Sequence, residues 1–166
     1  MAADLYLIRH GIAAERGEAW PDDTKRPLTD EGVRRLRRIA GGLREVGVTL
    51  DIMLSSPLVR AKQTAEILAA GLQPRPLIVS SEALSPAGAY AGVLDELAQH
   101  ARRRRIGLVG HEPGMGALAA RLIGSRHALE FKKGAVALIE VAALPPTGTG
   151  SLRWFLTPRL LRRLGK

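Results

Sequence analysis

The chain has 166 residues and no cysteine, and 46% of its residues are hydrophobic and 25% charged. These proportions are typical of a globular protein with one domain, and they exclude wholesale disorder, disulfide bonds, thiol catalysis and zinc–thiolate sites. The formal net charge of +9 suits an anionic partner such as nucleic acid, acidic lipid or an acidic substrate. The favoured interpretation is nevertheless a solvated, arginine-rich surface that binds nothing.

Segments that would direct the chain to a membrane are not expected. No run of about 18 apolar residues is present, and Asp4 precedes the first apolar segment in place of a basic leader. We therefore predict one domain over residues 1–166, no membrane association and a cytoplasmic location, with which the lack of cysteine is compatible.

The first apolar segment, Leu5–Ile8, has the composition of a buried strand and is followed by Arg9, His10 and Gly11. Ligands of open α/β sheets bind beyond the carboxyl ends of the strands, so Arg9 and His10 are expected at the edge of a site. Glycine at position 11 allows a sharp turn or a close approach of the backbone to a ligand. The tripeptide predicts an anion site with a nucleophilic or proton-transferring imidazole.

A polar segment over residues 12–27 is expected to form a long loop, of a length that is often functional or mobile. Thr29 is suited to cap a helix that has acidic residues in its first turn, and Gly47 is suited to end it. Apolar residues recur between them at helical spacing: Val33, Leu36, Ile39, Ala40 and Leu43.

A second polar cluster, Ser55-Ser56-Pro57, follows a predicted strand over residues 50–54. Pro57 is expected in the first turn of the next helix, which carries Arg60 near its start. The remaining predicted elements are a strand (77–79), a turn-rich loop (82–88), a helix (90–100), a strand (106–110), a helix (115–123), a hairpin of two strands (135–141 and 152–156) and a short basic tail (160–164).

Strands that alternate with helices predict a largely parallel sheet with helices on both faces, and the closing hairpin makes the sheet mixed. The expected fold class is therefore a single three-layer α/β/α domain. Arg102–Arg105 is the densest basic run and directly precedes a predicted strand. We expect it to be an exposed helix end and loop, and no RNA-binding aromatic pattern accompanies it, so nucleic acid is not the favoured partner.

Three predicted strands end in unusual polar residues, and a second histidine, His111, follows the strand over residues 106–110. If these strands are parallel, Arg9, His10, Arg60 and His111 converge on one rim. Arginines clamp phosphate oxygens with two planar donors, and an imidazole is a competent nucleophile. Helix N-termini near Pro57 and Pro113 would add backbone donors, so the rim is suited to phosphoryl transfer.

In this arrangement the chain resembles the histidine phosphatase superfamily. Because it is short, it is most similar to the small SixA-type branch of that superfamily. The matching segments span most of the chain in the family's order: Arg9–Gly11, Arg26–Gly32, Ser55–Glu66 and Val109–Pro113. The resemblance implies a phosphoglycerate mutase-like fold and phosphohistidine phosphatase activity. It also implies that no metal and no cofactor is required.

The same resemblance implies roles for residues. His10 would attack phosphorus and become phosphohistidine, while Arg9, Arg60 and His111 would hold the phosphoryl oxygens. Larger relatives use a carboxylate from the middle of the chain as general acid, and Glu82 is the only carboxylate in the corresponding loop. Glu82 is thus either a possible general acid or a solvent-exposed loop residue. The general acid is the feature in which this sequence departs from the family pattern.

The expected substrate is a phosphohistidine-bearing protein, because a phosphoramidate nitrogen can be protonated before cleavage and needs little help from an acid. A broad-specificity phosphatase of small phosphorylated metabolites is the first alternative. A non-catalytic phosphate-binding module is the second, and the presence of both His10 and His111 favours the enzyme over it. Binding of nucleic acid through the net positive charge is the third.

Overall fold

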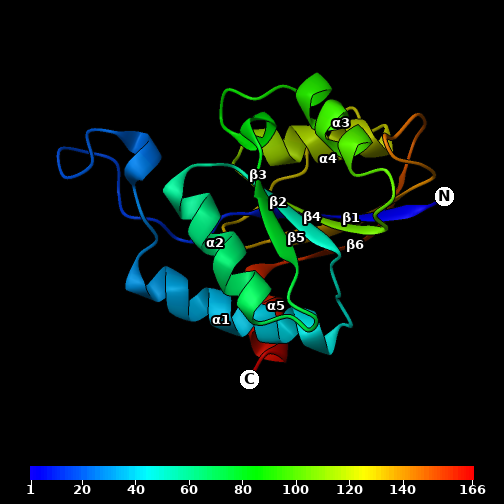
Figure 1. Cartoon of the computed structure of the whole chain (residues 1–166). Helices are drawn as coiled ribbons and strands as arrows, with labels where there is room; N and C mark the ends of the chain where they lie inside the picture. The colour runs from blue at the N-terminus through cyan, green and yellow to red at the C-terminus, as the bar shows by residue number, and fades with distance from the viewer.

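The computed structural model describes every residue from Met1 to Lys166, and a six-stranded sheet lies at its centre (Figure 1). The strands are β1 (Ala3–Arg9), β2 (Ile52–Ser55), β3 (Leu77–Ser80), β4 (Arg105–Gly110), β5 (Val136–Val141) and β6 (Ser151–Leu156). Their order across the sheet is β3-β2-β4-β1-β5-β6. β1 to β4 are parallel, β5 pairs antiparallel with β1, and β6 pairs antiparallel with β5. The predicted mixed sheet with a closing hairpin is confirmed.

Helices cover both faces of this sheet (Figure 1). On one face lie α1 (Asp30–Glu45), α2 (Val59–Ala70) and α5 (Pro158–Leu164), and on the other lie α3 (Tyr90–Gln99) and α4 (Gly114–Ile123). Two short 3-10 helices, η1 (Asp23–Lys25) and η2 (Glu82–Leu84), lie in the connections. The three-layer α/β/α prediction is therefore confirmed.

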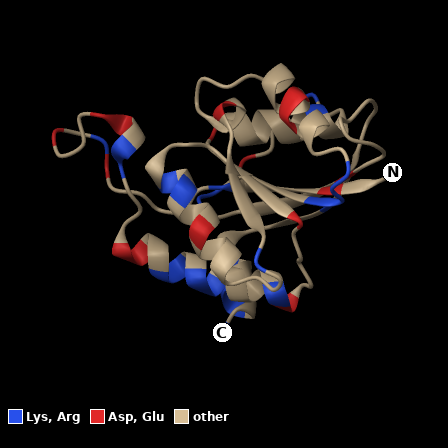
Figure 2. Cartoon of the chain, in the orientation of Figure 1, with Lys and Arg blue, Asp and Glu red and all other residues tan.

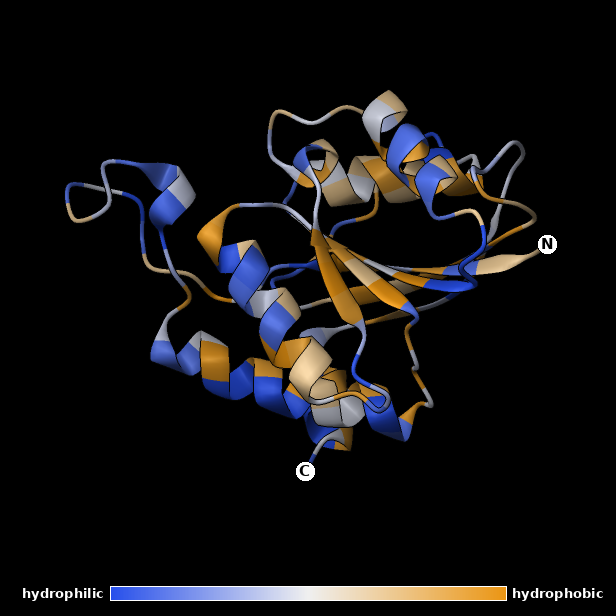
Figure 3. Cartoon of the chain, in the orientation of Figure 1, coloured by the Kyte–Doolittle hydropathy of each residue, from blue (hydrophilic) through white to orange (hydrophobic).

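The core is divided in two by the sheet, because successive residues of a strand point to opposite faces. In β1, Leu5 and Leu7 join the apolar cluster beneath α3 and α4, whereas Tyr6 and Ile8 join the cluster beneath α1, α2 and α5. Figure 3 shows the same division, with hydrophobic strands between helices whose outer faces are hydrophilic. The central strands β1, β2 and β4 are thus largely buried on both faces, and their ligand-accessible positions are at the strand ends.

Strand register brings three distant segments of the chain to one rim. Arg9 pairs with Gly110 in the β1–β4 ladder, and Ser55 pairs with Val109 in the β2–β4 ladder. The ladders continue one residue further, because the N–H of His10 donates to the Gly110 carbonyl over 3.1 Å and the N–H of Ser56 donates to the Val109 carbonyl over 3.0 Å. The residues that follow β1, β2 and β4 are neighbours for this reason.

The C-terminal segment corrects one prediction. Residues 160–164, expected as a basic tail, form the end of helix α5. The Thr157 side chain accepts a hydrogen bond from the N–H of Leu160, Pro158 lies in the first turn, and Leu161 is fully buried against the α1 layer. A capping threonine followed by proline is a helix-start signal, so the sequence carried this information.

The start of α2 corrects a second prediction. The helix begins at Val59 with Leu58 as its N-cap, so Pro57 precedes the helix and does not lie in its first turn. The physical reason is a turn closed by Ser56, whose hydroxyl oxygen accepts a hydrogen bond from the N–H of Leu58 over 3.2 Å.

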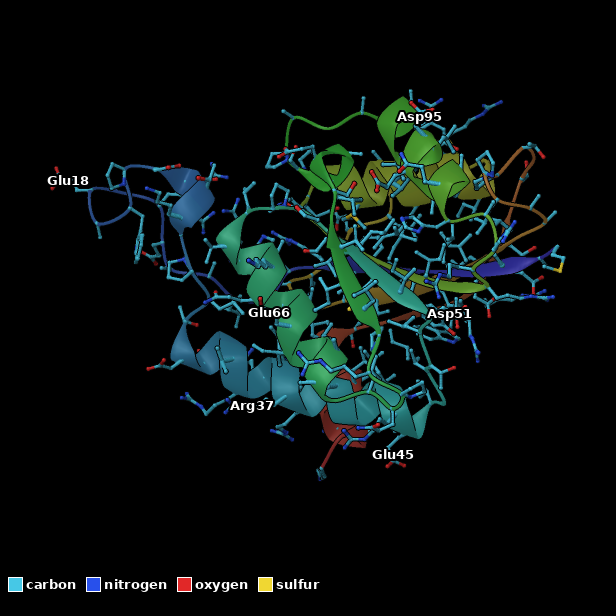
Figure 4. All side chains as sticks on the ribbon, in the orientation of Figure 1. Glu18, Arg37, Glu45, Asp51, Glu66 and Asp95 are labelled. Carbon is cyan, nitrogen blue, oxygen red and sulfur yellow. The ribbon has the colours of Figure 1, made fainter.

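The basic run Arg102–Arg105 lies at the opposite rim of the sheet from His111, because β4 begins at Arg105 and ends at Gly110. The Asp51 carboxylate accepts hydrogen bonds from the N–H groups of Arg104 and Arg105 over 2.8 and 2.9 Å, and Figure 4 labels Asp51 at that end. The run is exposed and mostly loop, as predicted. None of the helices has both the length and the apolar content that crossing a membrane demands.

Candidate active site

The rim formed by β1, β2 and β4 contains a cavity of about 320 Å³ that is lined by all four of the predicted histidines and arginines: Arg9, His10, Arg60 and His111. The imidazole rings of His10 and His111 lie with their centroids 5.1 Å apart. The residues His10 and His111 are 5% and 6% exposed, and Arg60 is 2% exposed. The structure therefore brings together four side chains from the ends of β1 and β4 and from the first turn of α2.

His10 is held in one tautomer by its own turn. Its Nδ1 lies 2.7 Å from the Gly11 carbonyl oxygen, which can only accept a hydrogen bond, so Nδ1 carries the proton and Nε2 keeps its lone pair. The turn is anchored to α2, because the Gly11 N–H donates to Thr64 Oγ1 over 3.1 Å and the Thr64 hydroxyl donates to the Arg60 carbonyl over 2.7 Å. This arrangement presents an imidazole nitrogen suited to nucleophilic attack.

Close packing against α1 explains why residue 11 is glycine. Its backbone φ is not positive, so a left-handed turn does not require it. A Cβ at this position would instead overlap the side chain of Leu36 in α1. Glycine therefore lets the His10 turn lie directly against the first long helix.

His111 is oriented by Ser56. Its Nε2 lies 2.8 Å from Ser56 Oγ, and that oxygen already accepts the Leu58 N–H. The Ser56 hydroxyl can donate to Nε2, and in that tautomer the imidazole proton lies on Nδ1. His111 Nδ1 is buried and has no hydrogen-bond partner in the protein.

Arg60 is positioned by Asp23, which belongs to η1 in the long loop before α1. Arg60 Nη1 donates to the Asp23 carbonyl oxygen over 2.8 Å, and Arg60 Nη2 donates to Asp23 Oδ2 over 3.0 Å. The other carboxylate oxygen, Oδ1, accepts from Arg26 Nε over 3.0 Å. Arg26 is 8% exposed and also lines the cavity, so one carboxylate aligns two guanidinium groups.

Two buried guanidinium nitrogens, Arg9 Nε and Arg60 Nε, have no hydrogen-bond partner within the protein. Arg9 is held through its Nη1, which donates to the Phe131 carbonyl oxygen over 2.8 Å. Buried donors are almost always satisfied in folded proteins. Arg9 and Arg60 line the cavity together with Lys133 and Arg16, and this concentration of positive charge suits the rim to an anion.

The pKa values of both histidines are lowered. Burial is the main cause for His10 and lowers its pKa to about 3; the hydrogen bond to the Gly11 carbonyl opposes this shift, and the neighbouring His111, Arg60 and Arg9 add to it. Burial and the nearby Arg60 lower the pKa of His111 to about 4. Burial disfavours the charged form of an imidazole, so both rings are neutral at pH 7, which keeps the His10 lone pair available.

Glu82 is not brought to this cavity. It is an exposed residue at the start of η2 and does not line the space between the two histidines. The carboxylates that do line it are Glu15, which is exposed, and Glu112, whose oxygens accept the N–H groups of Gly116 and Phe131 over 2.6 and 3.3 Å. No three His, Cys, Asp or Glu side chains lie close enough together to hold one metal ion.

Sequence reasoning placed Ser56 at the rim and Thr64 near it without assigning either a supporting role, and it missed Asp23 altogether. Thr64 and Ser56 lie within the segment Ser55–Glu66 that carries the family resemblance, so a weak signal was present. Asp23 lies in a polar loop with nothing local to distinguish it from Asp22. Only the path of the loop shows that Asp23 contacts Arg60.

Comparison with known proteins decides the family. Residues 5–84 match the family model of the histidine phosphatase superfamily (branch 1). Phosphohistidine phosphatase SixA of Escherichia coli is 29% identical over 158 residues, which are 93% of each chain. The chain belongs to the histidine phosphatase superfamily.

The likeness of this histidine phosphatase to the SixA type extends over the whole fold. A solved structure of the protein histidine phosphatase SixA complexed with tungstate superposes on this chain with a TM-score of 0.84 and 27% identity. The alignment covers 95% of this chain and 99% of the SixA chain. An uncharacterized protein of Picosynechococcus is 38% identical over 138 residues, 80% of this chain and 82% of that one. The predicted resemblance to the small SixA-type branch is confirmed, and the family makes this chain a phosphatase.

Proposed function

We propose that this histidine phosphatase hydrolyses phosphohistidine on a protein substrate through a covalent phosphohistidine intermediate at His10. The observation that carries the proposal is the pair of buried imidazoles 5.1 Å apart beside Arg9 and Arg60, with His10 Nδ1 committed to the Gly11 carbonyl. The printed name of the E. coli relative, a phosphohistidine phosphatase, supports the same substrate class.

In the first step, the lone pair of His10 Nε2 attacks the phosphorus of the substrate. A P–N bond to His10 forms as the P–N bond to the substrate imidazole breaks, and the released electron pair returns to the substrate nitrogen, which takes up a proton. The charge on the phosphoryl oxygens meets the side chains of Arg9, Arg60 and His111, which line the cavity. Donors that are already oriented need no rearrangement as charge develops.

In the second step, water attacks the phosphorus of phosphorylated His10. Its P–N bond breaks, the electron pair returns to Nε2, and inorganic phosphate leaves after the attacking water has lost a proton. The same cationic donors hold the phosphoryl group in both steps. We propose that no metal ion is needed, because the guanidinium groups supply the positive charge that a metal would provide.

The carboxylates around the cavity support an N–P rather than an alkyl O–P substrate. An alkoxide leaving group needs a proton from a well-placed acid, but Glu112 is engaged with two backbone N–H groups, and Glu15 and Glu82 are exposed. A phosphoramidate nitrogen can take its proton from solvent before the bond breaks. We therefore expect a phosphohistidine peptide to be turned over much faster than a phosphoserine peptide of the same sequence.

Trapping of the intermediate tests the proposal. The enzyme is incubated with ³²P-labelled phosphoramidate, quenched in alkali and digested, and the labelled residue is located. Label on His10 that is absent from the His10→Ala variant is the expected result. Label on another residue, or turnover that persists in His10→Ala, contradicts the covalent mechanism, and equal rates on phosphohistidine and phosphoserine peptides contradict the substrate class.

A further inference from the structure

A second cavity, also of about 320 Å³, lies directly beside the catalytic one. Its walls come from the loop after η2, the start of α3 and the first turns of α4, which lie on the same face of the sheet (Figure 1). The lining is mostly apolar and includes Leu84, Pro86, Tyr90, Val93, Met115 and Leu118. Apart from His111, which also lines the catalytic cavity, its lining residues have no role in the phosphoryl chemistry described above.

The two cavities adjoin. Pro86, His111 and Glu112 line both of them, so a group bound in one cavity lies next to the other. The catalytic cavity is rich in cations, whereas the second is apolar, with the Arg121 guanidinium packed 4.0 Å from the centre of the Tyr90 ring at its wall. A ligand that fits both has a phosphoryl group at one end and an apolar group next to it.

We infer that the apolar cavity is a substrate subsite that receives one apolar side chain of the peptide segment carrying the phosphorylated histidine. The inference rests on the proposed function. A volume of about 320 Å³ is at the lower end for pockets that enclose a whole small molecule. Because the phosphoryl group is held in the adjoining cavity, the apolar space is left for a neighbouring side chain. The name apolar subsite is used below for this cavity.

Burial of that side chain gives the enzyme sequence preference. Removal of apolar surface from water stabilises the complex roughly in proportion to the area buried. An apolar pocket of this kind discriminates between side chains by about tenfold or more. The preference is expected at one or two positions near the phosphohistidine and nowhere else, because the two cavities are contiguous.

The test uses phosphohistidine peptides in which a single leucine is moved through the four positions on each side of the histidine and compared with serine. Wild-type enzyme is expected to show about tenfold higher kcat/KM for leucine at one of these positions. Ala117 of α4 lines the apolar subsite and is exposed, so Ala117→Leu fills it, and the ratio between the leucine and serine peptides falls towards one. Ala91→Leu on α3, exposed and outside the subsite, keeps both the ratio and the basal activity.

Several outcomes overturn the inference: no leucine preference at any position, or a preference that survives Ala117→Leu. A similar gain in kcat/KM for small alkyl phosphoramidates that carry no peptide would assign the subsite to a metabolite. It would contradict the inference that a peptide side chain occupies the subsite. If Ala117→Leu is inactive, unphosphorylated peptides are compared as inhibitors of wild-type phosphoramidate hydrolysis, and equal inhibition by leucine and serine peptides overturns the subsite. Failure of wild type to hydrolyse phosphoramidate at all contradicts the proposed function instead.

Discussion

Asp23 shows how much of the anion site depends on a residue that does not line its cavity. Its carboxylate and its carbonyl oxygen both accept from Arg60, and the carboxylate also accepts from Arg26. These guanidinium groups lower the pKa of Asp23, although partial burial opposes them, so the residue is ionised under all ordinary conditions. A charged, hydrogen-bonded partner preserves the orientation of an arginine fork better than water does.

We predict that Asp23→Ala lowers kcat/KM for phosphoramidate by about tenfold to a hundredfold, the range typical of a misplaced positioning group. Arg60 loses the carboxylate that accepts from its Nη2 and keeps only the backbone carbonyl of residue 23 as the partner of its Nη1, so its guanidinium group is held less firmly at the cavity. Asp22→Ala is the matched control, because Asp22 caps η1 through Thr24 and contacts no arginine. Equal losses of kcat/KM in the two variants would show that Asp23 stabilises the fold of the loop and does not act by positioning Arg60.

The lowered pKa of His10 gives a prediction about pH. The nucleophile is the neutral ring, and burial with neighbouring cations lowers its pKa to about 3 from 6.5. As pH falls, the ring stays neutral through the range in which a solvated histidine would protonate. The acidic limb of kcat/KM is therefore expected well below pH 6.5, after correction for non-enzymatic hydrolysis, with circular dichroism at each pH to confirm that the fold persists. A midpoint near 6.5 would show that the ring is solvated.

At the scale of secondary-structure elements, α1 and α5 pack closely because α1 lacks side chains where α5 crosses it. Gly41 and Gly42 are buried in α1, and a Cβ at Gly42 would overlap the backbone of Leu161 in α5. Glycine in a helix interior ordinarily costs about 1 kcal/mol relative to alanine. Here the close approach of α5 offsets that cost, since it buries Leu161 completely.

We predict that Gly42→Ala lowers the free energy of unfolding by about 1–3 kcal/mol, the usual cost of overpacking, although alanine is the better helix former. Urea denaturation monitored by circular dichroism measures the change. Gly148→Ala serves as control, because a Cβ there would meet nothing within 4 Å, and it is expected to change stability by less than about 0.5 kcal/mol. A stabilised Gly42→Ala variant would contradict the described packing of α5.

For the whole molecule, the net charge of +9 is distributed over several separate groups of cations. Figure 2 shows basic residues along the outer faces of the helices as well as near the end of the sheet where the cavity lies, and Figure 4 shows Arg37 of α1 pointing away from the sheet. Only the cavity combines cations with buried, unpartnered donors. An anion should therefore bind there selectively and stabilise the fold.

We predict that inorganic phosphate at about 100 times its Kd raises the free energy of unfolding by about 2.7 kcal/mol, as expected for binding to the native state alone. Thermal denaturation with and without phosphate at constant ionic strength measures the effect. The increment is expected to fall sharply in Arg60→Gln. It is expected to persist in Arg102→Gln, at the opposite rim, and an increment lost in both variants would mean that phosphate acts on the overall charge.

The sequence by itself determined the alternation of strands and helices, the mixed three-layer fold and the family. Those features depend on local patterns: apolar runs in strands, helical spacing such as Leu36 to Leu43, and polar residues directly after a strand. Parallel pairing then placed His10 and His111 at the same rim, because residues that follow adjacent parallel strands are neighbours. The helix α5 was also encoded locally, in Thr157 and Pro158.

Only the tertiary structure decided which partners hold these side chains. The contact of Asp23 with Arg60 spans 37 positions and depends on how a long loop returns over α2, which no local pattern specifies. Likewise the exposure of Glu82, the contact between His111 and Ser56, and the position of the apolar subsite beside the catalytic cavity follow from packing between separate elements. Local propensity is set by neighbouring residues, whereas these features are set by the relative positions of distant ones, and those positions exist only once the chain has folded.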